Sequence, residues 1–264
     1  MSKDSLAVTR YGSPQGKPLC IIHGWGCDSS FLLPVAKMFR DRDIFLIDLP
    51  GYGMSKDLKH IANSLEETSL ALFNALPKQC DVIAWSIGSI FAFKAANLPD
   101  SPIDKLVTIC GTPRFPKDPN WPGVSYNFIM KCKNLLTPRR CNRLLKLFFR
   151  MQTEEILHGK DEFTILHSLL SQSEEIPFEV LTAGIEMMAY ADVREDFKHI
   201  KIPCLHLFGR KDRFVPCALA KNMNINKLHQ TFIFEHSSHS PYLTEPDLFY
   251  EKVSAFLEDK NLNS

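Results

Sequence analysis

The stretch Asp81-Val-Ile-Ala-Trp-Ser-Ile-Gly-Ser89 decides how the rest of the chain is interpreted. Its apolar residues 82–84 predict a buried strand, and the apolar run at 90–96 predicts a buried helix. A strand that turns sharply into a helix with a serine at the apex is typical of a nucleophile elbow, which lifts the serine hydroxyl clear of the sheet. The helix that follows directs backbone N–H groups towards the place where an oxyanion would form. Ser86 is therefore a candidate nucleophile, although Ser-Gly turns are also common without any function.

The apolar runs on either side of this stretch predict the fold class. They lie at residues 6–11, 19–22, 44–47, 106–110, 204–208 and 231–234. Helical patterns alternate with them at residues 31–39, 64–76, 218–223 and 247–257. Strands that alternate with helices at this spacing predict an α/β fold, with a mostly parallel central sheet and helices on both faces.

The alternation stops near the middle of the chain. From residue 113 to about residue 192 no buried strand is expected, only helical pattern interrupted by prolines. We therefore predict a core formed by residues 1–114 and 193–264, with an inserted helical cap at residues 115–192.

Two further candidate catalytic residues, Asp212 and His239, each follow a predicted strand. Residues just past the carboxyl ends of parallel strands gather at one edge of a sheet, so both are expected to lie near Ser86. A serine becomes a nucleophile when a histidine accepts its proton, and a carboxylate orients that histidine. The sequence thus predicts a catalytic triad in the chain order Ser86, Asp212, His239. His236 is a competing histidine, but His239 lies deeper in the loop and begins a His-x-Pro sequence.

The segment His23-Gly-Trp-Gly26 predicts the second part of the site. It follows a strand expected to neighbour the elbow strand, so the backbone N–H of Trp25 is a candidate oxyanion donor. The N–H of Ile87, directly after the nucleophile, is the other candidate. We expect His23 to brace the loop. Trp25 and Trp85 are either core aromatics or walls of an acyl pocket.

Composition limits the classes of function. The chain has 264 residues, a net charge of +1 and 45% hydrophobic residues, as expected of an ordinary globular protein with no general affinity for nucleic acid or membranes. Neither a signal peptide nor a membrane-spanning run is evident. The eight cysteines include no C-x-x-C pair, so we expect no metal, no cofactor and no disulfide. We expect a cytoplasmic monomer.

Positive charge is concentrated in the predicted cap. Residues 119–153 contain no Asp or Glu, and after Pro138 a helical pattern places four cations on one face: Arg139, Arg143, Lys146 and Arg150. The apolar side chains of the same segment lie on the opposite face. Charged stripes are usually solvated faces, but a helix of this kind normally mixes both signs. We therefore expect the stripe to dock an acidic partner.

Together these motifs resemble the α/β-hydrolase superfamily and predict its fold. The cap sequences narrow the resemblance to the BioH family of pimeloyl-acyl carrier protein methyl ester carboxylesterases: Trp121-Pro-Gly123, Phe148-Phe-Arg-Met-Gln-Thr153, Gly184-Ile-Glu186 and Asp192-Val-Arg194. The similarity runs from about residue 19 to residue 257. This sequence departs from the family pattern at the elbow, where Ala84 and Ser89 replace glycines.

The resemblance implies a function in the synthesis of the pimeloyl moiety of biotin. A methyl ester would be hydrolysed while the acyl chain remains on an acidic acyl carrier protein. Carried over by position, the residues implied to line the oxyanion hole and acyl slot are Trp25, Ile87, Phe148, Phe149, Arg150, Met151 and Gln152.

Two other functions remain open from the residues alone. A general short-chain carboxylesterase would keep the triad and would not need the cationic cap. A non-catalytic ligand receptor on a hydrolase scaffold belongs to a different class, and activity on a short chromogenic ester would argue against it. Dehalogenases and epoxide hydrolases are disfavoured because their elbow carries a carboxylate, whereas Ser86 is a hydroxyl.

Overall fold

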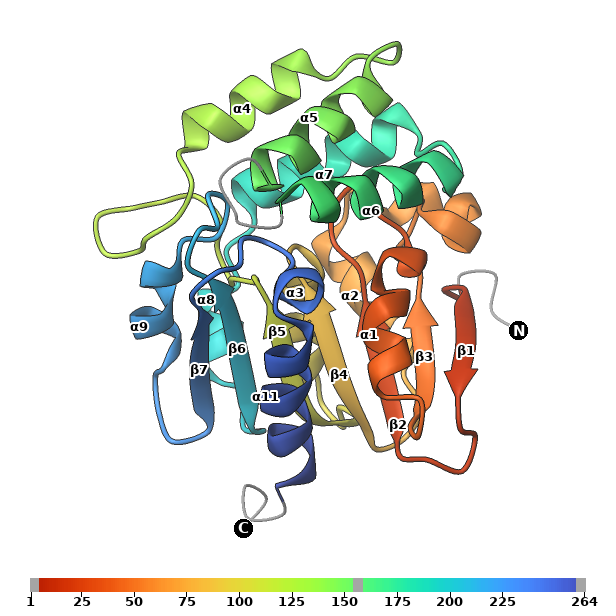
Figure 1. The fold of residues 1–264 in the computed structure, drawn as a ribbon, viewed down its shortest axis with the longest axis vertical. Coiled ribbons are helices and arrows are strands. Elements are labelled where there is room, and N and C mark those ends of the chain that lie inside the picture. Colours follow the sequence, from red (N-terminus) through yellow and green to blue (C-terminus); the bar gives the residue numbers. More distant parts are fainter. Residues whose placement is uncertain (1–4, 154–158, 260–264) are drawn as a thin grey trace.

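The central sheet of the protein is seven-stranded within residues 5–153 and 159–259, which the computed structural model describes (Figure 1). Its order is β1-β3-β2-β4-β5-β6-β7, and only β1 is antiparallel to its neighbour. The strands are β1 Val8–Gly12, β2 Pro18–Ile22, β3 Asp43–Ile47, β4 Cys80–Trp85, β5 Ile103–Ile109, β6 Cys204–Gly209 and β7 His229–Phe234. The expected α/β-hydrolase fold with a mostly parallel sheet is confirmed.

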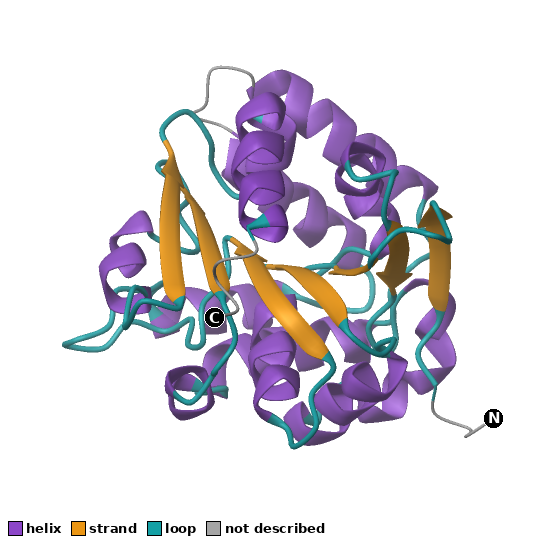
Figure 2. Cartoon of the chain, turned by 90° about the horizontal axis from the view of Figure 1, so that it is seen from below, coloured by secondary structure: helices purple, strands orange, loops and turns teal. Residues whose placement is uncertain are grey.

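The inner strands are largely buried because helices cover both of their faces (Figure 2). Every residue of β4 and of β6 is buried. The helices that flank the sheet are α1 Leu33–Met38, α2 Leu65–Ala75, α3 Gly88–Asn97, α8 Arg194–Lys198, α9 Ala220–Met223, α10 Pro241–Thr244 and α11 Pro246–Glu258. Of these, α2, α3 and α8 contact one another in series, whereas α10 contacts α1 and α11.

Two details of the expected layout are wrong. The first strand runs from Val8 to Gly12 rather than over residues 6–11, because it pairs with β3 from Val8 onward. A 3₁₀ segment at Gly53–Ile61, which the sequence pattern did not predict, follows the loop after β3.

Four helices gather above the carboxyl edge of the sheet, where the cap was expected (Figure 1). They are α4 Tyr126–Leu135, α5 Cys141–Thr153, α6 Gly159–Gln172 and α7 Phe178–Tyr190. The division into core and cap at residues 115–192 stays a prediction, and residues 154–158 of that segment lie outside the described part of the chain.

The cap helices are seated on the core through close approaches at glycines. A Cβ on Gly184 of α7 would lie 2.4 Å from the Trp25 ring, and the Trp25 indole donates a hydrogen bond of 3.0 Å to the Leu181 carbonyl. A Cβ on Gly26 would lie 2.3 Å from Leu145 of α5. Both contacts fix the cap beside the loop that follows β2.

A charged cluster joins the two connections between core and cap. Arg194 binds the carboxylates of Asp192 and Asp118 and lies over the Trp121 ring, whose indole donates to the Arg114 carbonyl. Two of the cap sequences that carried the family resemblance therefore meet at one place.

None of the helices in the described ranges is both long and apolar enough to cross a bilayer. The eight cysteines, all within the described ranges, are free thiols.

Candidate active site

Ser86 lies at the turn between β4 and α3 with a left-handed backbone, φ 55°. A residue other than glycine is strained in this conformation, and such strain is typical of functional turns. The Ser86 N–H donates to the Ile109 carbonyl at 2.9 Å, which anchors the turn to β5. The sequence thus places a serine hydroxyl at the carboxyl edge of the sheet, at the start of a helix.

The loop after β2 lies against this turn, because β2 and β4 are parallel neighbours. A Cβ on Gly24 would lie 3.1 Å from the Ser86 Cβ, so the segment carrying Trp25 directly flanks the elbow carrying Ile87. Among the described residues, neither the Trp25 N–H nor the Ile87 N–H donates a hydrogen bond. Both groups are therefore available to a bound oxygen atom.

His23 fixes the shape of this loop. Its Nε2 accepts a hydrogen bond of 2.9 Å from the Leu49 N–H, so the ring proton is on Nδ1, which donates to the Gly24 carbonyl at 2.8 Å. Burial lowers the pKa of His23, and the ring is neutral at pH 7. It braces the loop, as we expected from the sequence.

Asp212 and His239 form a buried hydrogen-bonded pair. His239 Nδ1 lies 2.6 Å from Asp212 Oδ2, and the other carboxylate oxygen accepts from the N–H groups of Phe214 and Val215 at 2.7 and 3.0 Å. The carboxylate is thereby held by its own loop, and it fixes the His239 tautomer with the proton on Nδ1. The opposite nitrogen, Nε2, is buried and has no hydrogen-bond partner in the described chain. His236 is exposed and lies outside this pair.

Aromatic side chains position His239 from several sides. The Trp85 indole donates to the His239 carbonyl at 2.9 Å, so the residue before the nucleophile holds the backbone of the histidine. The rings of Phe148 and Phe214 lie 6.5 and 6.0 Å from the imidazole, and 4.6 Å from each other. Sequence reasoning missed Phe214, because nothing in its local pattern separates it from a core residue.

A cavity of about 270 Å³ opens beside Ser86 between the core and helices α4, α5 and α7. Among the described residues, its lining is apolar except for Ser86 and Lys131 and contains no carboxylate. Of the cap residues implied by the resemblance, Phe148 and Met151 line this cavity, as does Trp25. The arrangement suits an apolar chain that extends from the serine towards the cap.

The other implied residues lie elsewhere. Ile87 borders a separate, small cavity, and Phe149 is fully buried against Phe31. Arg150 is exposed, whereas Gln152 is buried and neither its amide nitrogen nor its amide oxygen has a partner in the described chain. A five-residue helical segment cannot turn every side chain into one cavity, because its faces differ by about 100° per residue.

The cationic residues of the cap lie on its outer side. Arg143, Lys146 and Arg150 are exposed on α5, and Arg139 is exposed in the turn before this helix begins at Cys141. No carboxylate of the described residues pairs with Arg139, Arg143 or Lys146. One other cation of the acid-free segment, Lys133, is paired with Glu186 of α7 at 2.6 Å and is locally neutralised.

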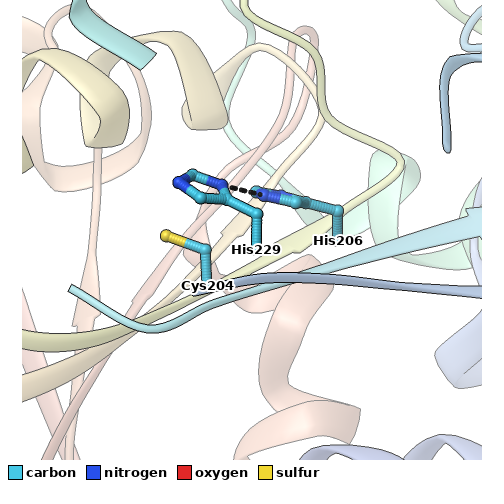
Figure 3. Close-up of side chains that lie close together, drawn as sticks. All are labelled: Cys204, His206 and His229. Carbon is cyan, nitrogen blue, oxygen red and sulfur yellow. Dashed lines mark hydrogen bonds between the residues drawn. The ribbon is translucent and has the colours of Figure 1, made fainter. Parts of the chain in front are cut away.

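Within the described part of the chain, two clusters contain the side-chain types that bind metal ions. Cys110 lies with Asp212 and His239, but those two are already joined, and the Cys110 thiol is directed at the Ser238 carbonyl. The second cluster, Cys204, His206 and His229, is buried near the amino ends of β6 and β7 (Figure 3).

Hydrogen bonding pairs both ring nitrogens of His206 and one of His229, whose buried Nε2 has no partner in the described chain. Figure 3 shows His206 and His229 turned towards each other, with 3.0 Å between Nε2 and Nδ1. The other nitrogen of His206 lies 2.8 Å from the Thr108 hydroxyl. Burial lowers the pKa of both rings and raises the pKa of the Cys204 thiol. This neutral network suits the interior of a sheet.

The chain matches the model of the Alpha/beta hydrolase family over residues 21–252. It is 30% identical to the pimeloyl-[acyl-carrier protein] methyl ester esterase of Vibrio cholerae, over 96% of this chain and 98% of that protein. A protein of the same name from Legionella pneumophila is also 30% identical, over 96% of this chain and 100% of that protein.

Solved structures show the same fold at lower identity. An esterase from Exiguobacterium antarcticum superimposes with a TM-score of 0.84 at 19% identity, covering 96% of both chains. A bromoperoxidase from Bacillus anthracis superimposes with a TM-score of 0.84 at 17% identity, covering 96% of this chain and 95% of that chain. The comparisons confirm the resemblance expected from the sequence and the expected enzyme class, a carboxylic ester hydrolase.

Proposed function

Because the chain belongs to the Alpha/beta hydrolase family, we propose that it is a serine carboxylesterase that hydrolyses the methyl ester of a pimeloyl group carried by an acyl carrier protein. The observation that carries the proposal is one coincidence. The strained Ser86 borders an apolar cavity whose wall, at Phe148 and Phe214, also contacts the imidazole of the Asp212–His239 pair. The relatives from Vibrio cholerae and Legionella pneumophila are named for this substrate.

In the first stage, Ser86 attacks the ester carbonyl. Its hydroxyl proton passes to His239 Nε2, the nitrogen left without a partner, while Asp212 stabilises the imidazolium that forms. The Trp25 and Ile87 N–H groups stabilise the oxyanion, a contribution of about 3–4 kcal/mol per donor in comparable sites. The bond to the methoxy oxygen breaks, and His239 returns the proton so that methanol leaves.

In the second stage, water hydrolyses the acyl-enzyme. His239 Nε2 accepts a proton from the water, whose oxygen attacks the acyl carbonyl, and the proton then passes to the Ser86 oxygen as it leaves. The product carries a free carboxylate at the end that entered the site.

The cavity supports an acyl chain as the bound group. Its volume of about 270 Å³ and apolar lining suit a flexible chain of methylene groups, and each buried methylene contributes about 0.8 kcal/mol. Leu135 and Leu147, both partly exposed, are among its lining residues and place its opening at the outer surface of the cap. A chain attached to a larger carrier would enter there.

The exposed cations on α5 and in the turn before it support a carrier protein as the partner. Arg139, Arg143 and Lys146 lie on the outer side of the cap without a carboxylate partner in the described chain. An acidic carrier docked on them would place its acylated arm at the cavity opening. We further propose a cytoplasmic enzyme, which the eight free thiols support.

The test compares two substrates with one enzyme. The purified protein is incubated with the methyl ester of pimeloyl-acyl carrier protein and, separately, with a short chromogenic ester. We expect Ser86-dependent release of methanol from the carrier-bound ester with kcat/KM well above that of the free ester. Turnover of the free ester alone would instead assign a general short-chain esterase.

A further inference from the structure

A carboxyl group occupies an apolar position of the cap helix α6. Four residues of this helix are buried, Gly159, Glu162, Leu166 and Leu170, and the last three recur at intervals of four residues on one face. Leucines would be expected at all three positions of such a stripe. Glu162 is only 2% exposed, and it is not among the residues that line the cavity. Neither solvent nor the cavity therefore explains a carboxyl group at this position.

Neither oxygen of Glu162 has a hydrogen-bond partner among the described residues. Helix α6 contacts α5, α10 and the turn at Ser29–Leu32, and α10 directly follows His239 and Ser240. The Ser240 hydroxyl is close enough to favour the ionised carboxyl, yet it also lacks a hydrogen bond. Two buried polar side chains without hydrogen-bond partners therefore lie near each other at the junction of the cap and the histidine loop.

The charged and titratable groups around Glu162 come from the core. Asp212, at the end of β6, raises the pKa of Glu162, and the Glu162 charge acts in turn on Cys110 and Tyr242. The cations of α5 are exposed on its outer side, and the Ser29–Leu32 turn has no titratable residue. No cation of the described residues compensates Glu162, while the carboxylate that orients His239 opposes its ionisation.

Burial, with the smaller effect of Asp212, raises the pKa of Glu162 to about 8. At pH 7 the side chain is therefore a neutral acid whose O–H can donate a hydrogen bond. Between pH 4.5 and about 8 the unfolded chain releases a proton that the folded chain keeps, so this residue lowers the stability of the fold as pH rises through that window. A leucine at this position would not lower the stability of the fold in this way. A residue that costs stability beside a catalytic pair is a candidate for function.

Building on the proposed function, we infer that Glu162 is a positioning residue of the esterase. In the working enzyme its carboxyl would donate a hydrogen bond to the Ser240 hydroxyl, which is unpaired in this structure, and would tie helix α6 to the loop that carries His239. Ionisation would put a second negative charge beside Asp212, and the Ser240 hydroxyl would then turn to donate to Glu162. We expect the repulsion between the two carboxylates and this reversal of the hydrogen bond to displace the loop that carries His239, with a loss of kcat rather than of substrate affinity.

The experiment compares Glu162→Gln and Glu162→Leu with the exposed cap control Glu175→Gln, using a short chromogenic ester between pH 6 and pH 10. Wild-type kcat should fall above about pH 8, by up to about tenfold per pH unit. Glu162→Gln, which keeps a donor but does not titrate, should extend the plateau. Glu162→Leu should lower kcat at pH 7 by about tenfold at unchanged KM, while it unfolds at a higher temperature than the wild type.

Two results would overturn the assignment of Glu162. One is the same alkaline limb in the wild type and Glu162→Gln, and the other is wild-type kcat in Glu162→Leu. Failure of the esterase proposal is distinguishable from both, because it would appear as equal rates for the wild type and Ser86→Ala.

Discussion

Ser89 on α3 occupies the space that Gly111 leaves open after β5. A Cβ on Gly111 would lie 2.5 Å from the Ser89 Oγ and 2.6 Å from its Cβ. The Ser89 hydroxyl donates to the Ser86 carbonyl at 2.6 Å and accepts from the Thr112 N–H at 3.2 Å. Ser89 at the elbow is therefore accommodated by a glycine that follows the neighbouring strand, and its hydroxyl holds the elbow in place.

The first prediction tests this pair. Gly111→Ala should destabilise the fold by about 1–3 kcal/mol, because the added methyl overlaps Ser89. Urea unfolding would measure the change in midpoint. The double variant Gly111→Ala/Ser89→Gly should recover most of the loss, and losses that simply add would show that the two residues do not share this space.

A second prediction concerns the nucleophile. Ser86→Ala should lower kcat on a short ester by about 10³-fold or more, leaving only the contributions of the oxyanion donors and of binding. The midpoint temperature of thermal unfolding should change little or rise slightly, because alanine can adopt the same turn and only the hydroxyl is lost. Residual activity above a few per cent of the wild type would remove Ser86 from the mechanism.

The two histidines of the last loop give a third prediction. His239→Ala should match the loss of Ser86→Ala, and the double variant should be no worse, because the two residues act as one unit. His236→Ala is the matched control, since that residue is exposed and lies in the same loop. Steady-state rates on the same ester would decide, and a larger loss for His236→Ala would contradict the assignment.

The sheet and the strand-end residues were predictable because their signals are local. Apolar runs predicted seven strands within about three residues, and Ser86, Asp212 and His239 each lie in the loop or turn that follows such a run. Their gathering at one edge then follows from parallel topology alone. The bracing role of His23 could likewise be proposed from its position in a loop beside the elbow.

What the sequence could not show depends on contacts between distant segments. The Trp85 indole reaches the His239 carbonyl across 154 positions, and Gly184 receives the Trp25 ring from a loop far earlier in the chain. Glu162 looks like any acidic residue in the first turn of a helix until its burial is known. The hydrophobic periodicity of a cap helix does not indicate which loop of the core its buried face will contact.

A fourth prediction follows from the buried histidine network. The folded-state pKa of His229 is about 4 and that of His206 is also lowered, whereas both are near 6.5 in the unfolded chain. The unfolded state therefore binds more protons as pH falls, and stability should be full above pH 6.5 and decline towards pH 4. The triple variant Thr108→Val/His206→Leu/His229→Leu should show a flatter decline in urea midpoints, unlike the exposed control His199→Ala. An equally steep decline in the triple variant would place the acid-sensitive groups elsewhere.

The last prediction tests the cationic surface of the cap. Exposed ion pairs contribute about 0.2–1 kcal/mol each, but several together accelerate encounter with an acidic partner and weaken with salt. The double variant Arg143→Glu/Lys146→Glu should therefore raise KM for the carrier-bound ester several-fold and flatten its dependence on ionic strength. Hydrolysis of the short free ester should stay at the wild-type rate, because both side chains are exposed and lie outside the cavity lining.

The matched control is Lys221→Glu/Lys227→Glu, which reverses two exposed charges of the core around helix α9. Equal losses on both esters would mean that the stripe supports the fold of the cap. An unchanged KM for the carrier-bound ester would mean that the stripe is a solvated face, and the carrier would then have to dock elsewhere.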